Sequence, residues 1–244
     1  RRLTRLGIPV LYYISPTVWA WRSGRLETIR RNVRKMCLIF PFEEKIYRNA
    51  GIPARFVGHP LLERVAVGLD RAAFRSRHGL DDGRPLITLL PGSRKSEIGY
   101  HLPVLLDAAA RLAAARPRQF VLPLAEDLDP SAVEPLIASS RVPVRILRGD
   151  HYEAMAHADL CLASCGTANL ETALLGTPFV AFYRLSRLTY AAGRPFVKIP
   201  LYSIVNILAG ERIVQELIQK SFTAGTLARE AERILGSAEV RETM

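Results

Sequence analysis

Short apolar runs alternate with helical segments along most of this 244-residue chain. In the second half, runs rich in β-branched and aliphatic residues predict strands over 86–90, 119–124, 143–147, 158–163 and 178–183. Between them, the pattern predicts helices near 101–116, 131–140, 151–157 and 167–175. Strands that alternate with helices are typical of βαβ units on a parallel sheet. The pattern therefore predicts a doubly wound α/β domain that is nearly complete.

The first part of the chain carries a shorter version of the same pattern. Strands are predicted over 8–14, 35–40 and 54–57, with helices over 25–34 and 43–50. Three strands are too few for a complete Rossmann-like domain. We therefore interpret this part as the carboxyl-terminal end of such a domain. We expect the end of a first domain over 1–60, a linker over 61–85, a second domain over 86–222 and a helical segment over 223–244.

Positive charge is concentrated in the amino-terminal part. The formal net charge is +11, and residues 1–60 hold 12 Lys and Arg against 3 Asp and Glu. This excess predicts an anionic partner: nucleic acid and an anionic membrane surface both fit, and a solvated basic helix is the plainer alternative. Aromatic residues among these charges form either an interfacial patch or packing between domains. They are Tyr12, Tyr13, Trp19 and Trp21.

The other bulk properties favour a globular protein of the cytoplasm. Hydrophobic residues make up 49% of the chain and charged residues 23%. No apolar run approaches the roughly 18 residues that a membrane-spanning helix needs. Cys37, Cys161 and Cys165 lie in or beside apolar runs without metal-ligand spacing, which fits a reducing compartment. No metal or other cofactor is predicted.

The first strand–helix junction of the second half suggests a phosphate site. Gly92 and Ser93 follow a buried strand, and their small size lets backbone N–H groups approach a phosphate at the start of a helix. Arg94 comes next, and its forked donors suit a diphosphate. A surface Arg after a tight turn is the alternative. Glu97 either positions Arg94 or caps the helix.

A second junction of the same kind lies about 70 residues later, at Cys165, Gly166 and Thr167. Thr167 either contributes to a phosphate loop or caps the helix that begins there. Glu171, one helical turn further on, either accepts the hydroxyls of a ribose or complements the helix dipole. Two such junctions in one half-chain predict a site for a nucleoside diphosphate.

Several other polar residues carry weaker signals. Tyr183 and Arg184 follow a strand and are a second possible phosphate or base contact. Asn206, in an apolar loop, either binds a ligand or holds a backbone turn. The pair Asp127 and Asp129 has the spacing of a metal-binding Asp-x-Asp motif, but capping of the next helix is favoured. Among the histidines, His59 is expected to serve a hinge rather than catalysis, and the remainder have little weight: His78, His101, His151 and His157.

Five blocks, taken in order, resemble the lipid-A-disaccharide synthases. They are YYISPTVWAWRSGR, PFEEKIYRNAGIPARFVGHPLLE, LLPGSRKSEI, SCGTANLETALLGTPFVAFYRLSRLTY and IVNILAGERIVQELIQ. The resemblance implies a GT-B fold with two Rossmann-like domains, the first incomplete here. It also implies an inverting hexosyltransferase of lipid A biosynthesis, peripheral on the inner face of the inner membrane. Such an enzyme transfers 2,3-diacylglucosamine from UDP to 2,3-diacylglucosamine 1-phosphate and releases UDP.

The resemblance also assigns positions. The family's diphosphate-binding Arg falls on Arg94, its Ser/Gly-Thr-x-x-x-Glu loop on Cys165 to Glu171, and its active-site Asn on Asn206. Cys165 stands where the family usually has Ser, so only a backbone contact is expected there. The family's catalytic Asp belongs to a region that would precede Arg1. No catalytic residue is therefore expected in this chain, which by itself should be inactive.

The partners implied are the UDP-linked and 1-phosphate forms of diacylglucosamine and an anionic membrane surface, with a homodimer left open. One alternative is a UDP-sugar 2-epimerase of the same architecture, which would need no acylated acceptor. Another is a peripheral nucleic-acid-binding protein that uses the basic first segment. Against the latter, the aromatics are not spaced as a stacking platform and the phosphate loops lie outside the basic region, so no nucleic acid is expected.

Overall fold

The computed structural model describes residues 2–20, 24–125, 128–196 and 200–244. The chain forms two compact units. The first consists of Arg1–Arg64 and Arg187–Pro200, and the second of Val65–Ser186 and Leu201–Met244. Trp21 and Asp127, singled out from the sequence, lie outside the described residues.

The second unit is built on a six-stranded sheet whose neighbouring strands all run parallel. Its strand order is β6-β5-β4-β7-β8-β9. The chain therefore forms β4 at the centre, adds β5 and β6 on one side, and then adds β7, β8 and β9 on the other side. The loops after β4 and β7 therefore leave the sheet side by side, where open α/β sheets bind ligands. The strands are β4 (Leu86–Leu90), β5 (Gln119–Leu124), β6 (Arg145–Arg148), β7 (Leu160–Ser164), β8 (Phe179–Tyr183) and β9 (Glu216–Ile218).

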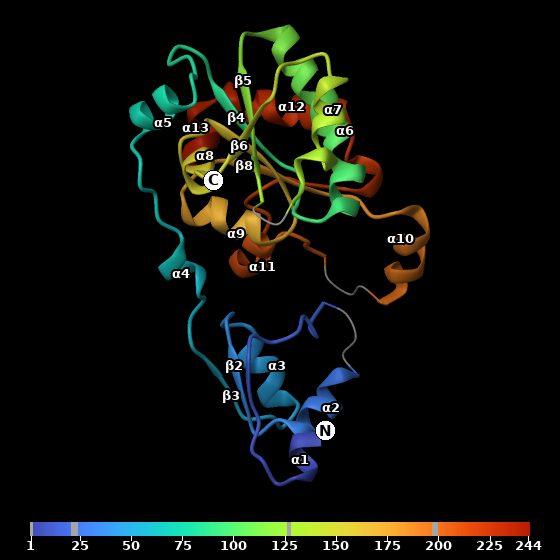
Figure 1. The fold of residues 1–244 in the computed structure, drawn as a ribbon. Helices are drawn as coiled ribbons and strands as arrows, with labels where there is room; N and C mark the ends of the chain where they lie inside the picture. The colour runs from blue at the N-terminus through green and yellow to red at the C-terminus, as the bar shows by residue number, and fades with distance from the viewer. Residues whose placement is uncertain (1, 21–23, 126–127, 197–199) are drawn as a thin grey trace. The chain divides into compact units, whose positions relative to one another are not determined.

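Helices cover both faces of this sheet (Figure 1). The long helix α6 packs against α12, and together they enclose one half of the core, which includes Leu89 and Leu162. On the other face, α8 and α11 pack against Cys161 and Ala163. The helices are α5 (Arg71–Arg77), α6 (Lys95–Ala115), α7 (Glu134–Ala138), α8 (His151–Ala156), α9 (Thr167–Leu174), α11 (Ile204–Ala209), α12 (Ala224–Leu235) and α13 (Ala238–Glu242).

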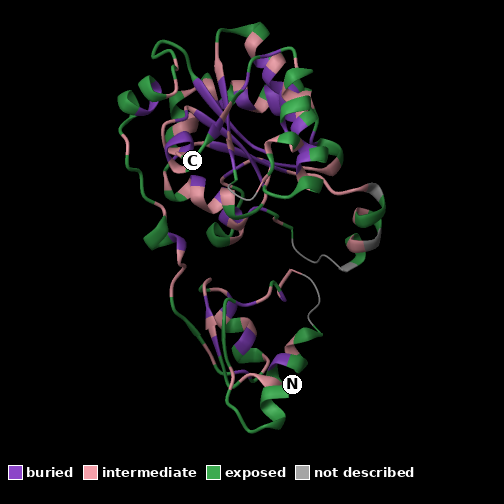
Figure 2. Cartoon of the chain, in the orientation of Figure 1, coloured by how far each residue is buried: buried purple, intermediate pink, exposed green. Residues whose placement is uncertain are grey.

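Strand β7 explains why the central strands read as unbroken apolar runs. Successive side chains of a strand point to opposite faces. Leu160 and Leu162 therefore enter the core under α6 and α12, while Cys161 and Ala163 enter the core on the other face. Every residue of β4 and β7 is buried, as the purple strands of Figure 2 show. A sheet covered on both faces needs this near-continuous apolar sequence.

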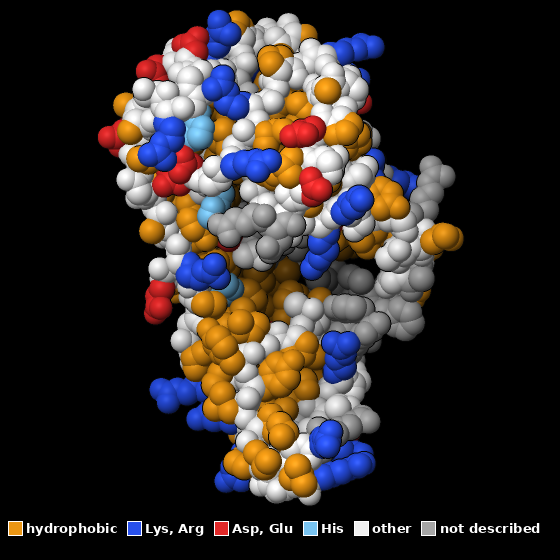
Figure 3. Space-filling view, viewed as in Figure 1, with side chains coloured by type: hydrophobic (Ala, Val, Ile, Leu, Met, Phe, Trp, Pro, Cys, Tyr) orange, Lys and Arg blue, Asp and Glu red, His pale blue; other side chains and the backbone are white. Residues whose placement is uncertain are grey.

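The first unit holds a three-stranded parallel sheet of order β1-β2-β3. Its core is small and centres on Met36, Leu38 and Tyr47. Strand β1 has only exposed side chains, and in Figure 3 apolar side chains spread over the surface of this unit beside Lys and Arg. Its elements are α1 (Arg2–Arg5), β1 (Leu11–Tyr13), α2 (Arg25–Asn32), β2 (Lys35–Leu38), α3 (Glu43–Asn49), β3 (Ala54–Phe56), α4 (Leu61–Arg64) and α10 (Arg187–Gly193).

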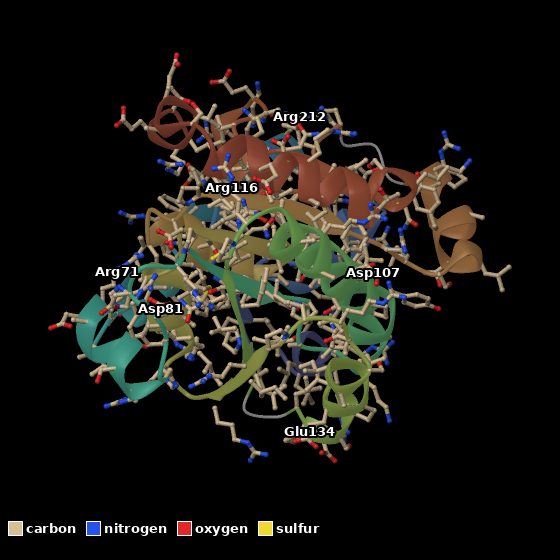
Figure 4. All side chains as sticks on the ribbon, turned by 90° about the horizontal axis from the view of Figure 1, so that it is seen from above. Arg71, Asp81, Asp107, Arg116, Glu134 and Arg212 are labelled. Carbon is tan, nitrogen blue, oxygen red and sulfur yellow. The ribbon has the colours of Figure 1, made fainter. Side chains whose placement is uncertain are left out.

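Residues 65–85, expected to be a linker, pack within the second unit. Phe74 of α5 is fully buried, and Arg75 is 1% exposed and donates to the carbonyl oxygens of Asp81 and Arg84. Arg71 extends from α5 to Asp159, with 3.1 Å between guanidinium and carboxylate. Figure 4 shows Arg71 and Asp81 beside this helix. Phe74 contacts His157 and Arg71 contacts Asp159, so partners far along the chain order residues 65–85. The local sequence of this segment carries only turn signals.

The predicted α/β class with parallel sheets is confirmed. One local prediction is wrong: Asn206 lies on helix α11 and not in a loop. The short strand β9 was not expected either, because Glu216 interrupts its apolar pattern. Among the described residues, no helix is both long and apolar enough to cross a membrane.

Candidate functional site

The loop between β4 and α6 has a backbone that only glycine adopts easily. Gly92 has φ +112°, a region that side-chain-bearing residues rarely enter. A Cβ placed on Gly92 would also lie 2.4 Å from Oε2 of Glu97. Both constraints act at the carboxyl edge of the sheet, next to the first turn of α6. The loop can therefore bring backbone N–H groups close to an anion.

Glu97 organises this loop, and it both positions Arg94 and caps the helix. Its Oε1 accepts a hydrogen bond from Nη1 of Arg94 at 2.8 Å, and its Oε2 lies 3.4 Å from the backbone nitrogen of Arg94. The hydroxyl of Tyr183 donates to the same carboxylate at 3.3 Å. Burial raises the pKa of Tyr183, which keeps this hydroxyl protonated. The Arg94 side chain is 75% exposed, so its remaining donors face solvent.

His101 joins two loops that the sequence separates widely. The residue is fully buried on α6. Its Nδ1 lies 2.6 Å from the carbonyl oxygen of Pro91, and its Nε2 lies 3.0 Å from the backbone nitrogen of Arg184. Burial lowers the pKa of His101 and favours the neutral ring. His101 had little weight as a candidate from the sequence, because its partners lie 10 and 83 residues away along the chain.

The second junction begins helix α9. Gly166 is the N-cap residue, and Thr167 is the first residue of the helix, so the alternative that Thr167 caps α9 is wrong. Gly166 and Thr167 are exposed, which leaves the first turn accessible to a ligand. Burial raises the pKa of the Cys165 thiol, so this side chain is neutral and the backbone is the part of Cys165 that suits an anion. Glu171 lies one turn further along and is half-buried.

Arg184 is turned toward the segment after β9. Its guanidinium donates to the carbonyl oxygen of Phe222 and lies 5.0 Å from the centre of the Phe222 ring. A second contact, at 3.5 Å, reaches the carbonyl oxygen of Gln219. The guanidinium is therefore already engaged within the protein, and its contact with a phosphate or base stays a prediction. Its backbone, held by His101, is the part of Arg184 next to the loop that ends in Arg94.

Asn206 closes a turn with all of its hydrogen-bonding capacity. Its Nδ2 donates to the Val214 carbonyl oxygen and to Oε1 of Glu216, both at 2.9 Å. Its Oδ1 accepts from the backbone nitrogens of Ile213 and Val214. Oε1 of Glu216 also accepts from the backbone nitrogen of Ser203 at 2.8 Å. Of the two roles left open for Asn206, the geometry favours the turn.

A small pocket lies at the same carboxyl edge, one strand away from β4. It has a volume of about 200 Å³ and opens between the ends of β5 and β6. Gly149, with φ +78°, follows β6 and forms part of its wall. This pocket was not predicted from the sequence, although the Gly149–Asp150 turn after an apolar run was a usable signal. The pocket is lined by Leu124, Ala125, Leu128, Arg148 and Gly149.

Asp129, the described member of the acidic pair, caps a helix. Asp129 caps a short 3₁₀ helix by accepting a hydrogen bond from the backbone nitrogen of Ser131 at 2.9 Å, and this bond lowers the pKa of its carboxyl. His59 also serves a turn, because its Nδ1 accepts from the backbone nitrogen of Leu61. Within the described part of the chain, no group of three or more His, Cys, Asp or Glu side chains could hold a metal ion.

Comparison with known proteins identifies the family of this chain. The family model described as Lipid-A-disaccharide synthetase matches residues 2–243. The chain belongs to this family. Among its curated relatives, the lipid-A-disaccharide synthase of Solibacter usitatus is 43% identical over 244 residues, which is all of this chain and 64% of the relative. That of Anaeromyxobacter dehalogenans strain 2CP-C is 47% identical over 243 residues, 99% of this chain and 63% of the relative.

The chain also shares its fold with more distant proteins. A structure of HepE from Anabaena in complex with UDP and glucose has a TM-score of 0.57 at 14% identity, over 99% of this chain and 66% of that one. A putative UDP-N-acetylglucosamine 2-epimerase from Listeria monocytogenes has a TM-score of 0.59 at 13% identity, over 99% and 62%. These likenesses show a GT-B fold. The chain spans less than two thirds of the length of these curated relatives, 64% and 63%.

Proposed function

We propose that this chain provides the UDP-sugar-binding part of a lipid-A-disaccharide synthase. The observation that carries the proposal is the position of the two glycine-containing loops. They leave the sheet side by side at β4 and β7, where the strand order reverses, and each leads into a helix N-terminus. Arg94 stands on one of these loops with most of its guanidinium exposed. Membership of the synthetase family supports the choice of ligand.

In this proposal the diphosphate lies against the first turns of α6 and α9. The backbone of Gly92, Ser93, Gly166 and Thr167 approaches it, and Arg94 adds a positive charge. The pocket bounded by Gly149 takes the base, because it opens on the same edge of the sheet. Glu171, on the first turns of α9, accepts the hydroxyls of the ribose. HepE, which has the same fold, is known in complex with UDP and glucose.

The reaction follows from what these groups do to a leaving nucleotide. The 6-hydroxyl of 2,3-diacylglucosamine 1-phosphate attacks the anomeric carbon of UDP-2,3-diacylglucosamine and inverts it, while the bond to the diphosphate breaks. Arg94 and the two helix N-termini stabilise the charge that develops on UDP as it leaves. They act through fixed donors, so they need no reorganisation during the step. A general base takes the acceptor's proton, and none of these groups is assigned that role. The basic amino-terminal part is proposed to bind an anionic membrane surface.

A calorimetric titration with UDP and UMP tests the ligand and the role of Arg94. Replacing Arg94 with Ala should weaken binding of UDP about 10- to 100-fold, since hydrogen bonds to charged groups contribute about 1.5–3 kcal/mol. Binding of UMP should change less, because Arg94 is assigned to the diphosphate. Arg111→Ala, an exposed position on the same helix, removes the same charge away from the loop and should leave both affinities unaltered.

The titration has two decisive outcomes. No binding of UDP by the unaltered chain would refute the proposed function. Equal UDP affinity in the Arg94 and Arg111 variants would remove Arg94 from the site. In the full-length enzyme, the Arg94→Ala substitution should cost about 2–4 kcal/mol of transition-state stabilisation, as the loss of an oxyanion donor does. The acceptor requirement of that enzyme separates a transferase from a UDP-sugar 2-epimerase.

A further inference from the structure

We propose that His101 is a positioning residue, which fixes the loop after β4 against the loop after β8 and so sets the backbone that receives the diphosphate. The inference rests on the proposed function and extends it to a residue that touches neither nucleotide nor sugar. His101 lies on α6 between two backbone segments, Pro91 and Arg184, and its ring nitrogens contact both.

The geometry assigns the hydrogen on the ring. The carbonyl oxygen of Pro91 can only accept, and it lies 2.6 Å from Nδ1, so Nδ1 carries the hydrogen. The backbone nitrogen of Arg184 can only donate, and it lies 3.0 Å from Nε2, so Nε2 accepts. In this tautomer one neutral ring satisfies a buried acceptor and a buried donor together. Neither leucine nor glutamine reproduces both contacts.

The two backbone segments held by His101 adjoin the residues that shape the proposed site. Pro91 immediately precedes Gly92, whose positive φ turns the backbone toward the diphosphate position. Arg184 immediately follows Tyr183, whose hydroxyl holds Glu97. Fixing Pro91 and Arg184 therefore fixes both ends of the contact between the β4 loop and β8. Aromatic packing keeps the ring in place, since the centres of Phe182 and Phe222 lie 5.3 and 5.8 Å from its own.

Protonation of the ring would change this arrangement. A charged ring donates from Nε2, so it can no longer accept from the backbone nitrogen of Arg184. The Arg184 carbonyl oxygen, 3.1 Å away, would then become the partner, and the β8 loop would have to shift. The charged groups that face His101 are Glu97 on its own helix and Arg184 after β8, with the phenol of Tyr183 also nearby. Because protonation breaks this contact, we expect UDP affinity to fall as the pH drops below about 6.5, the ordinary pKa of histidine.

The test compares His101→Asn, His101→Gln and His101→Leu with the unaltered chain in UDP titrations. Asn can still donate near the Nδ1 position and Gln can still accept near Nε2, whereas Leu replaces neither contact. We expect UDP affinity about 3- to 10-fold lower for Leu, and smaller losses for Asn and Gln. His157→Asn is the matched control. It removes a histidine that also contacts a backbone carbonyl, that of Leu69 at 2.7 Å, outside the proposed site.

Two readouts distinguish positioning from general destabilisation. The ratio of UDP affinity at pH 7.5 to that at pH 5.5 should be larger for the unaltered chain than for His101→Asn, a comparison that cancels titration of the nucleotide itself. Nitrogen NMR of the ring should show hydrogen on Nδ1. Hydrogen on Nε2 at neutral pH would overturn the inference, as would UDP affinities in folded His101 variants equal to that of the control. Failure of the unaltered chain to bind UDP would overturn this inference and the proposed function together.

Discussion

Replacing Gly92 with Ala tests the geometry of the first loop most directly. A non-glycine residue at φ +112° costs about 1–2 kcal/mol, the usual cost of a left-handed backbone. The new Cβ would lie 2.4 Å from Glu97, so that side chain must move. A forced rotamer costs about 0.5–1.5 kcal/mol, and a weakened helix cap about 1 kcal/mol more. The free energy of unfolding should therefore fall by about 2.5–4.5 kcal/mol.

The measurement is thermal unfolding of three Gly→Ala variants followed by circular dichroism. For Gly92→Ala the second unit should unfold roughly 5–15 °C earlier, at about 2–4 °C per kcal/mol. Gly176 has φ +69° with nothing within 4 Å of an added Cβ, so its variant isolates the backbone cost. Gly99 lies on α6 with open space around it, and its variant should be slightly more stable.

The three variants also test function. Gly92→Ala should lower UDP affinity, because moving Glu97 releases Arg94 from its hydrogen bond. The other two variants should bind UDP as the unaltered chain does. A Gly92 variant whose unfolding temperature matches that of Gly176→Ala would show that Glu97 moves aside freely. Normal UDP affinity in the same variant would refute the role given to this loop.

Replacing Asn206 with Leu should lower the free energy of unfolding by about 2–4 kcal/mol, because buried backbone groups of Ile213 and Val214 lose their partner; an unchanged denaturation midpoint would contradict the turn described for Asn206. Sedimentation with anionic vesicles should retain the chain at low salt and release it as salt rises, through the basic residues of 1–60. Binding that ignores salt, or equal binding to neutral vesicles, would exclude an electrostatic membrane contact.

Except for β9, the strands of the second unit could be read from the sequence because burial on both faces imposes a local signal. The runs over 86–90 and 119–124 coincide with β4 and β5. Glycine in a turn is equally local, which is why both junctions were recognised. The order of the strands is different, because neighbours such as β4 and β7 meet only through the sheet. Their adjacency, which brings the two junctions together, needed the structure.

Residues that act through distant partners were misjudged or given little weight. Arg184 reads as a free cation after a strand, but Phe222, 38 residues away, takes its guanidinium. His101 reads as one helical histidine among several, and its second partner is 83 residues away. Asn206 was expected in an apolar loop, whereas it lies on α11 and bonds to Val214 and Glu216, eight and ten residues further along the chain. Sequence patterns report burial, whereas these roles depend on tertiary pairing.

The two loops rise from β4 and β7, the strands that the core encloses completely. The floor beneath the proposed nucleotide should therefore exchange its amide hydrogens among the slowest in the molecule, within a few residues of loops that exchange freely. The strands then serve mainly the stability of the fold, and the loops serve mainly ligand binding. Apart from positions such as Gly92, whose backbone only glycine adopts easily, substitutions in the loops can redirect ligand preference while the strands below keep the protein folded, which gives this surface room to evolve.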